Sequence, residues 1–182
     1  MNVILVSGKR CVGKDFIIKM LQTQCKGIHT NSQFYTKKDF CRDNNLSFNA
    51  FITDRNYKEK YRKKLIDYYN EKIKDEPHIF DMQVVKGIPK DFSGYIFIDI
   101  RLSSQIDFFK QHFDNVITLR INTSDNIRGR RGWKYDEVID QGKMETDLDD
   151  YSFDFVFNND HGTNNTILEL CENIQKMVSV CT

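Results

Sequence analysis

Four short apolar runs along the chain are typical of buried β-strands. They are Val3–Val6, Tyr95–Asp99, Val116–Ile121 and Phe153–Phe157. Strands buried on both faces of a parallel sheet show such continuous hydrophobic runs rather than strict alternation. A weaker strand near Ile28–Thr30 brings the expected number to about five.

Segments with helical spacing separate these runs. The first follows residue 14, where Phe16, Ile17, Met20 and Leu21 recur at helical intervals. Further helices are expected over Lys37–Asp43, Tyr57–Lys74, Ile79–Val85, Ser103–Phe113 and Thr163–Val178. Strands alternating with helices predict an α/β fold, a parallel sheet flanked by helices in three layers. Ligands of such sheets bind beyond the carboxyl ends of the strands.

The segment between the first strand and the first helix, Gly8–Asp15, has the pattern G-x-x-x-x-G-K. In a P-loop of this form, backbone N–H groups surround a polyphosphate and the lysine, here Lys14, reaches the β- and γ-phosphates. Asp15 stands where a hydroxyl residue usually contacts Mg²⁺. The order strand, loop, helix favours this interpretation over a glycine turn with a solvent-exposed lysine. The motif predicts a nucleotide-dependent phosphotransferase.

Other charged residues are placed to act with the loop. Asp99 and Arg101 follow a predicted strand, so one crevice at the carboxyl edge of the sheet can collect them with Lys14. Four arginines, Arg120, Arg128, Arg130 and Arg131, precede Gly132 and Trp133, and the acidic stretch Glu145–Asp150 follows, so that a basic and acidic insertion separates the last two strands. Phosphoryl transfer requires positive charge over the transferred group and exclusion of water. This insertion therefore resembles a lid; the alternative is a charged surface loop.

Composition narrows the possible partners and the compartment. The chain has 182 residues, with 27 Lys and Arg against 26 Asp and Glu, a net charge of +1. This balance argues against nucleic acid as a partner, and no apolar run is long enough to span a membrane. Five scattered cysteines are typical of reduced thiols. We expect a cytoplasmic monomer without a signal peptide.

At this point the motifs resemble those of the animal-type phosphomevalonate kinases. The matching residues are Ser7–Arg10 with Gly13–Phe16, Tyr57–Glu59 with Arg62–Lys63, Asp99 with Arg101, Arg130–Trp133, and Asp147–Asp149 with Asp154. The resemblance implies a P-loop kinase of the nucleoside-monophosphate-kinase fold, with ATP and Mg²⁺ as cofactors. It also implies a phosphorylated small molecule, mevalonate 5-phosphate, as acceptor. It gives one domain over residues 1–182, with an acceptor-binding helical region at about 36–90 and a mobile, arginine-rich lid at about 124–150.

The resemblance also assigns residues to roles. For catalysis it implies Arg10, Lys14, Asp15, Asp99, Arg101, Arg130 and Arg131. For nucleotide binding it implies Gly8, Lys9, Arg10, Cys11, Val12, Gly13, Lys14, Asp15, Arg131 and Asn158. For the acceptor it implies Lys58, Arg62 and Arg101, and for the metal Asp15 and Asp99. No general base is required, because an acceptor phosphate is already an ionised nucleophile.

The chain departs from the family on the acceptor side. Leu102, Ile73 and Met82 stand where the family tends to place arginines. An aliphatic side chain cannot replace the bidentate, charge-assisted contact of an arginine with phosphate. Two alternatives therefore stay open. One is a (deoxy)nucleoside monophosphate kinase, which can also show Asp-x-Arg after a strand. The other is a diverged member with little activity that binds nucleotide or a protein partner.

Overall fold

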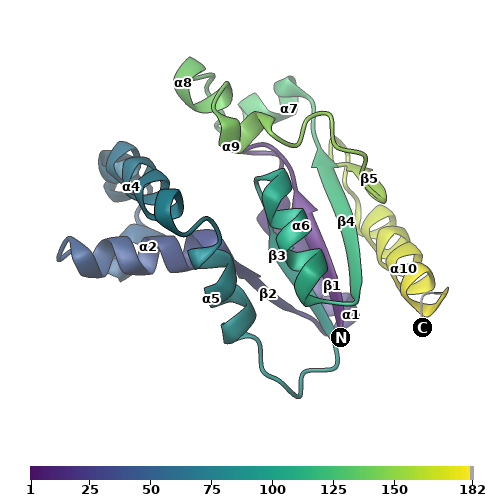
Figure 1. The fold of residues 1–182 in the computed structure, drawn as a ribbon. Helices are drawn as coiled ribbons and strands as arrows, with labels where there is room; N and C mark the ends of the chain where they lie inside the picture. The colour runs from purple at the N-terminus through teal and green to yellow at the C-terminus, as the bar shows by residue number, and fades with distance from the viewer. Residues whose placement is uncertain (181–182) are drawn as a thin grey trace. The chain divides into compact units, whose positions relative to one another are not determined.

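The central sheet has the strand order β2-β3-β1-β4-β5 (Figure 1). Its strands are β1 (Asn2–Ser7), β2 (Ile28–Asn31), β3 (Tyr95–Asp99), β4 (Asn115–Asn122) and β5 (Phe155–Asn158). The pairs β1–β3, β1–β4 and β4–β5 are parallel, so the carboxyl ends of these strands share one edge. The structure is a computed structural model that describes residues 1–180.

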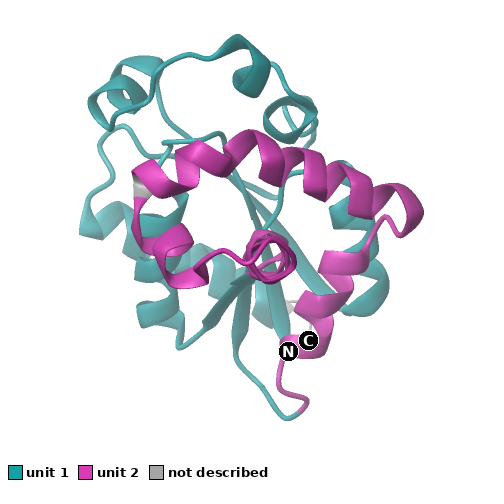
Figure 2. Cartoon of the chain, turned by 90° about the vertical axis from the view of Figure 1, so that its left-hand side faces the viewer, with its two compact units in different colours: residues 1–30, 91–182 teal, residues 31–90 magenta. Residues whose placement is uncertain are grey.

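The chain divides into two compact units, coloured separately in Figure 2. The first unit comprises residues 1–30 and 91–182, and the second comprises residues 31–90. Helices of the first unit are α1 (Lys14–Cys25), α6 (Ser103–His112), α7 (Asp125–Arg130), α8 (Glu137–Asp140), α9 (Lys143–Thr146) and α10 (Asn164–Val180). Helices of the second are α2 (Ser32–Asp43), α3 (Phe48–Thr53), α4 (Arg55–Asp75) and α5 (Ile79–Gly87). A single domain with lid and acceptor regions stays a prediction.

Helices cover both faces of the sheet in the first unit. On one face, α1 and α10 pack against alternate residues of β1 and β4 in a continuous apolar core. Members of this core include Ile4, Val6, Ile17, Leu119, Ile121 and Ile174. On the other face lies α6, whose Ile106 and Phe109 are buried (Figure 1). The predicted three-layer α/β fold with five strands is confirmed.

The second unit is helical and has its own apolar core. Phe40 and Cys41 of α2 and Phe51 of α3 are buried together, and the aromatic face of α4 packs against them. The sequence analysis did not predict α3, because its six residues show less than two turns of periodicity. Ser47 caps this helix by accepting a hydrogen bond from the Ala50 N–H at 3.3 Å.

Among the element boundaries that differ from the prediction, those of α2 and β5 are set by polar side chains. Helix α2 begins at Ser32 rather than Lys37, since Asn31 accepts a hydrogen bond from the Phe34 N–H at 2.6 Å and caps the first turn. Strand β5 begins at Phe155 rather than Phe153. Just before it, the Asp154 side chain accepts hydrogen bonds from the N–H and hydroxyl of Thr118, in place of backbone pairing.

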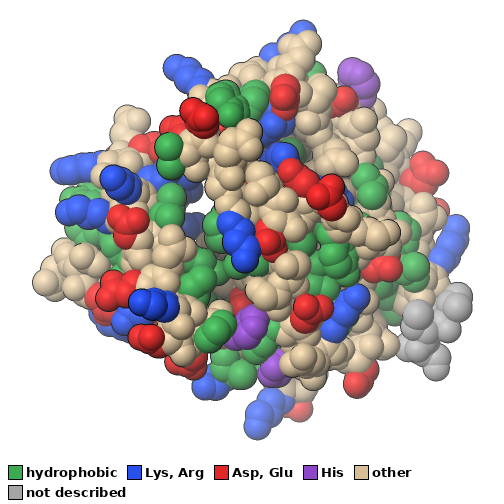
Figure 3. Space-filling model, turned by 45° about the horizontal axis from the view of Figure 1, so that its top comes forward, with side chains coloured by type: hydrophobic (Ala, Val, Ile, Leu, Met, Phe, Trp, Pro, Cys, Tyr) green, Lys and Arg blue, Asp and Glu red, His purple; other side chains and the backbone are tan. Residues whose placement is uncertain are grey.

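The charged side chains at the surface and the cysteines can be compared with the composition of the chain. On the face drawn in Figure 3, basic and acidic side chains are interspersed. Cys11, Cys25, Cys41 and Cys171 are free thiols, and Cys181 lies outside the described residues. Within residues 1–180, no helix combines the length and the apolar character that crossing a membrane requires.

We expect the second unit to depend on its aromatic core. Phe51 is 0% exposed, so Phe51→Ala should destabilise the protein by about 3–5 kcal/mol through lost burial and a residual cavity. The neighbouring Ile52 is 52% exposed, and Ile52→Ala should change stability by less than about 0.5 kcal/mol. Urea unfolding of both variants measures the difference. Equal losses would show that Phe51 does not anchor this core.

Candidate active site

The P-loop connects the end of β1 to the start of α1. Gly13 precedes the helix with φ of 90° and ψ of 24°, a left-handed conformation that glycine adopts without strain. A Cβ atom at this position would lie 2.6 Å from Nδ2 of Asn159 and 3.2 Å from a guanidinium nitrogen of Arg131. The loop therefore requires glycine here for both its backbone angles and its close packing.

Lys14 is the first residue of α1, and its side chain is buried under the loop. Its Nζ donates a hydrogen bond to the Gly8 carbonyl at 3.0 Å and lies 3.8 Å from Oδ1 of Asp99. Burial, and then the charge of Arg101, lower the pKa of Lys14, while nearby carboxylates including Asp99 oppose this shift. The lysine thus lies at the place where the motif requires it, already paired with an acidic side chain.

Asp99 lies at the carboxyl end of β3 and is 7% exposed. Its Oδ1 is buried without a hydrogen-bond partner, although Lys14 and the Nε of Arg101, at 3.6 Å, are both near. A buried carboxylate oxygen with spare acceptor capacity fits a hard cation such as Mg²⁺. Asp15, the other predicted metal residue, is exposed in the first turn of α1.

Arg101 is held at both its backbone and its guanidinium. Gln105 of α6 is buried, and its Oε1 accepts hydrogen bonds from the N–H groups of Arg101 at 2.8 Å and Leu102 at 3.1 Å. The guanidinium donates to Oε1 of Glu145 at 2.9 Å and to the Gly8 carbonyl at 3.4 Å. These contacts fix the arginine beside the P-loop.

Arg10, in the middle of the loop, pairs with Asp140 of α8. Its Nε and terminal NH2 donate to the two carboxylate oxygens at 2.8 and 2.6 Å, a bidentate geometry. Trp133 donates to the same carboxylate at 3.0 Å. Burial would raise the pKa of Asp140, but hydrogen bonds from Arg10, the Asp136 backbone and Trp133 outweigh it and lower the pKa to about 2.

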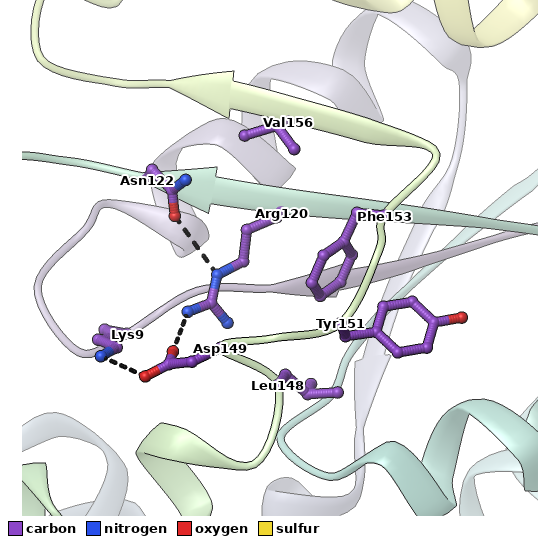
Figure 4. Close-up of a pocket in the computed structure, with 8 residues that line it drawn as sticks. All are labelled: Lys9, Arg120, Asn122, Leu148, Asp149, Tyr151, Phe153 and Val156. Carbon is purple, nitrogen blue, oxygen red and sulfur yellow. Dashed lines mark hydrogen bonds and ion pairs between the residues drawn. The ribbon is translucent and has the colours of Figure 1, made fainter.

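Lys9 and Arg120 converge on another carboxylate, Asp149, at the edge of a cavity of about 340 Å³ (Figure 4). Lys9 Nζ lies 2.7 Å from Oδ2 of Asp149, and the Arg120 guanidinium donates to Oδ1 at 2.7 Å. Arg120 also donates to the Ser7 hydroxyl at 3.0 Å and lies 5.8 Å from the centroid of the Phe153 ring. The side chains of Lys9 and Arg120 are therefore held next to Ser7 and Asp149, where the loop starts.

The far side of the loop is tied to the end of β5. The Val12 carbonyl accepts hydrogen bonds from Arg131 and from Nδ2 of Asn159, both at 2.8 Å, and from the Thr123 hydroxyl at 3.0 Å. Arg131 also donates to the Asn159 carbonyl at 2.8 Å. Asn158, the last residue of β5, accepts a hydrogen bond from the Asp160 N–H at 3.0 Å, and its place at the nucleotide stays a prediction.

The remaining predicted site residues lie in the loop, on α7 and on α4. Cys11 is in the loop with a φ of 64°, and Arg130 is exposed at the end of α7. Lys58 and Arg62 lie on α4 of the second unit, where Nε of Arg62 donates to Glu59 at 2.6 Å. Their place in an acceptor site stays a prediction.

Several acidic and amide residues contact the loop or its arginines, although the sequence analysis assigned none of them a role in the site. Asp140, Asp149 and Asn159 each contact the loop or its arginines, and Gln105 fixes the backbone of Arg101. The available signals were the acidic stretch after the arginines and the match of Asp147–Asp149 to the family, and neither identified the partners.

Comparison with solved structures identifies the fold. A gluconokinase from Sinorhizobium meliloti superposes with a TM-score of 0.60 at 10% identity, over 98% of this chain and 94% of that one. The shikimate kinase of Aquifex aeolicus gives a TM-score of 0.52 at 12% identity, over 96% of each chain. With the P-loop between β1 and α1, these likenesses define a P-loop kinase fold.

Sequence comparison then specifies the group within this fold. The family model for phosphomevalonate kinase matches residues 6–115. The phosphomevalonate kinase of Drosophila melanogaster is 32% identical over 168 residues, which span 88% of this chain and 89% of that protein. The chain belongs to the phosphomevalonate kinase family, as the motifs predicted.

The lowered pKa of Asp140 predicts a specific dependence of stability on pH. Its charge stabilises the folded state fully above the unfolded carboxyl pKa of about 3.9, and this contribution disappears as the pH falls through about 2. Asp140→Asn should therefore be less stable than the parent at pH 7, with a deficit that shrinks below about pH 4. Urea unfolding between pH 3 and 7 tests this. Glu137→Gln, an exposed change in the same helix, is the control; a deficit for Asp140→Asn that does not vary with pH contradicts the assignment.

Proposed function

We propose that the protein transfers the γ-phosphoryl group of ATP to mevalonate 5-phosphate, giving mevalonate 5-diphosphate and ADP. The observation that carries this proposal is the meeting of Lys14 and Arg101 at Asp99 under the P-loop, in a chain of the phosphomevalonate kinase family. An oxygen of the acceptor phosphate attacks the γ-phosphorus, and the bond from the γ-phosphorus to the β–γ bridging oxygen breaks. The electron pair leaves with ADP, so no proton has to be removed from the nucleophile.

The residues divide this task between binding and charge stabilisation. Loop N–H groups and Lys14 hold the β- and γ-phosphates, and Arg101 stabilises charge on the transferred group. Arg10, within the loop, and Arg131, which donates to the Val12 carbonyl, position the reacting phosphates. Catalysis then consists of positioning and electrostatic stabilisation, with no side-chain nucleophile.

Asp99 and Asp15 are the residues that would hold Mg²⁺. In kinases this ion usually binds to one or two carboxylates together with substrate phosphates and waters, which suits the unbonded Oδ1 of Asp99. When bound, Mg²⁺ neutralises charge on the β- and γ-phosphates. Within the described residues, no group of three or more His, Cys, Asp or Glu side chains is arranged to hold a metal by itself.

The acceptor side is assigned to Lys58, Arg62 and Arg101. The family usually has an arginine at the position of Leu102. Because this departure falls on the acceptor side, a nucleoside monophosphate is the second candidate acceptor. The cytoplasmic location and the monomeric state stay predictions.

A direct assay tests the proposed reaction. Purified protein with Mg-ATP is offered mevalonate 5-phosphate and, separately, nucleoside monophosphates, and ADP release is measured. We expect turnover only with mevalonate 5-phosphate. Lys14→Met should reduce it by at least about 100-fold, because the lysine charge on the phosphates is lost, while circular dichroism shows the same fold. Turnover of a nucleotide alone would establish the second candidate, and a fully active Lys14→Met protein would refute the role of the P-loop.

Restoring the missing arginine should strengthen acceptor binding. Leu102→Arg adds a charge-assisted contact to phosphate, so we expect the KM for mevalonate 5-phosphate to fall by about three- to tenfold, with the KM for ATP unchanged. Leu102→Gln, which adds polarity without charge, is the matched control. An unchanged acceptor KM in Leu102→Arg would show that this position does not face the acceptor.

A further inference from the structure

A carboxylate from the insertion between β4 and β5 binds to the P-loop itself. Oε2 of Glu145 accepts a hydrogen bond from the backbone N–H of Arg10 at 2.8 Å. Its other oxygen, Oε1, accepts from the guanidinium of Arg101 at 2.9 Å. Glu145 thus joins a loop N–H to the arginine that lies beside the loop.

The groups that bind Glu145 are those that bind phosphate in proteins of this fold. Backbone N–H groups of the loop cradle phosphate oxygens, and guanidinium groups pair with carboxylate and phosphate in the same geometry. The Glu145 side chain is only 8% exposed, so these donors, rather than water, satisfy most of its charge. The carboxylate has the charge and the acceptor geometry of a phosphate oxygen pair.

The neighbouring residues hold Glu145 in this place. Asp147 accepts hydrogen bonds from the N–H and hydroxyl of Ser103, at 2.7 and 2.8 Å, at the start of α6. Asp149 pairs with Lys9 and Arg120. The segment is therefore attached on the C-terminal side of Glu145 by two further carboxylates, and Glu145 is directed at the loop from a fixed backbone.

We propose that Glu145 occupies a phosphate position of the P-loop and competes with the phosphates of the nucleotide for it. The proposal rests on the proposed function, in which this loop binds ATP. Nucleotide binding then requires Glu145 to withdraw from Arg10 and Arg101. The apparent dissociation constant equals the intrinsic one divided by the fraction of molecules in which the position is free. If Glu145 occupies it about nine-tenths of the time, the nucleotide binds about tenfold more weakly than the loop alone allows.

The Glu145→Gln variant tests this competition. Glutamine keeps an oxygen that can accept from the Arg10 N–H but removes the charge that resembles phosphate. Isothermal titration calorimetry compares ADP, inorganic pyrophosphate and adenosine as ligands of the parent and the variant. We expect ADP and pyrophosphate to bind Glu145→Gln on the order of tenfold more tightly, and the affinity for adenosine to be unchanged. Glu137→Gln, exposed in α8, should bind all three as the parent does.

Each other result has a defined meaning. Unchanged or weaker ADP binding by Glu145→Gln, with normal binding by the parent, would overturn the competition and leave the proposed function standing. Equal tightening for adenosine would also overturn it, because the effect would then not act at the phosphates. Failure of ADP to bind either protein would overturn the proposed function together with this inference.

Discussion

Lys9, Arg10, Lys14 and Arg101 lie close together at the carboxyl edge of the sheet, and unpaired they would repel one another. Every one of them has a carboxylate partner, which lies in β3 or in the insertion between β4 and β5. Because Lys14 is buried, its charge depends on such pairing more than on water. The arrangement of the insertion follows from this requirement for charge balance.

The need to balance these positive charges also links ligand binding to the conformation of the protein. A site built for polyphosphate carries a large excess of positive charge when its ligand is absent. Here the protein supplies anions of its own, and in the competition proposed for Glu145 the ligand replaces one of them rather than entering an open cradle. The affinity for the nucleotide then depends on the difference in free energy between the ion pairs within the protein and the ion pairs made with the ligand. Substitutions in the acidic segment therefore change the affinity for the nucleotide, although these residues do not contact it.

The sequence predicted the parts of the molecule that depend on local pattern. Continuous apolar runs located the strands. The P-loop motif placed Lys14 at the carboxyl edge of the sheet, and the position of Asp99 after a strand placed it at the same edge. Helix α3 is too short for periodicity to show. The partners of the cations were also beyond prediction, because Asp140 lies 130 residues from Arg10 and no spacing rule joins them. Asn159 was not singled out, since successive side chains at the end of a strand point in opposite directions and the sequence does not show which of them meets the loop.

The hydrogen bonds on the Val12 carbonyl have a consequence for biosynthesis. Its three partners, Thr123, Arg131 and Asn159, are all translated more than 100 residues after the loop. During synthesis on the ribosome, β1 and α1 emerge first, yet the loop between them lacks the full set of these contacts until β5 and Asn159 have left the exit tunnel. The first part of the nascent chain is therefore completed by a much later one, and a chain truncated before β5 would carry the P-loop sequence without the bond from Asn159.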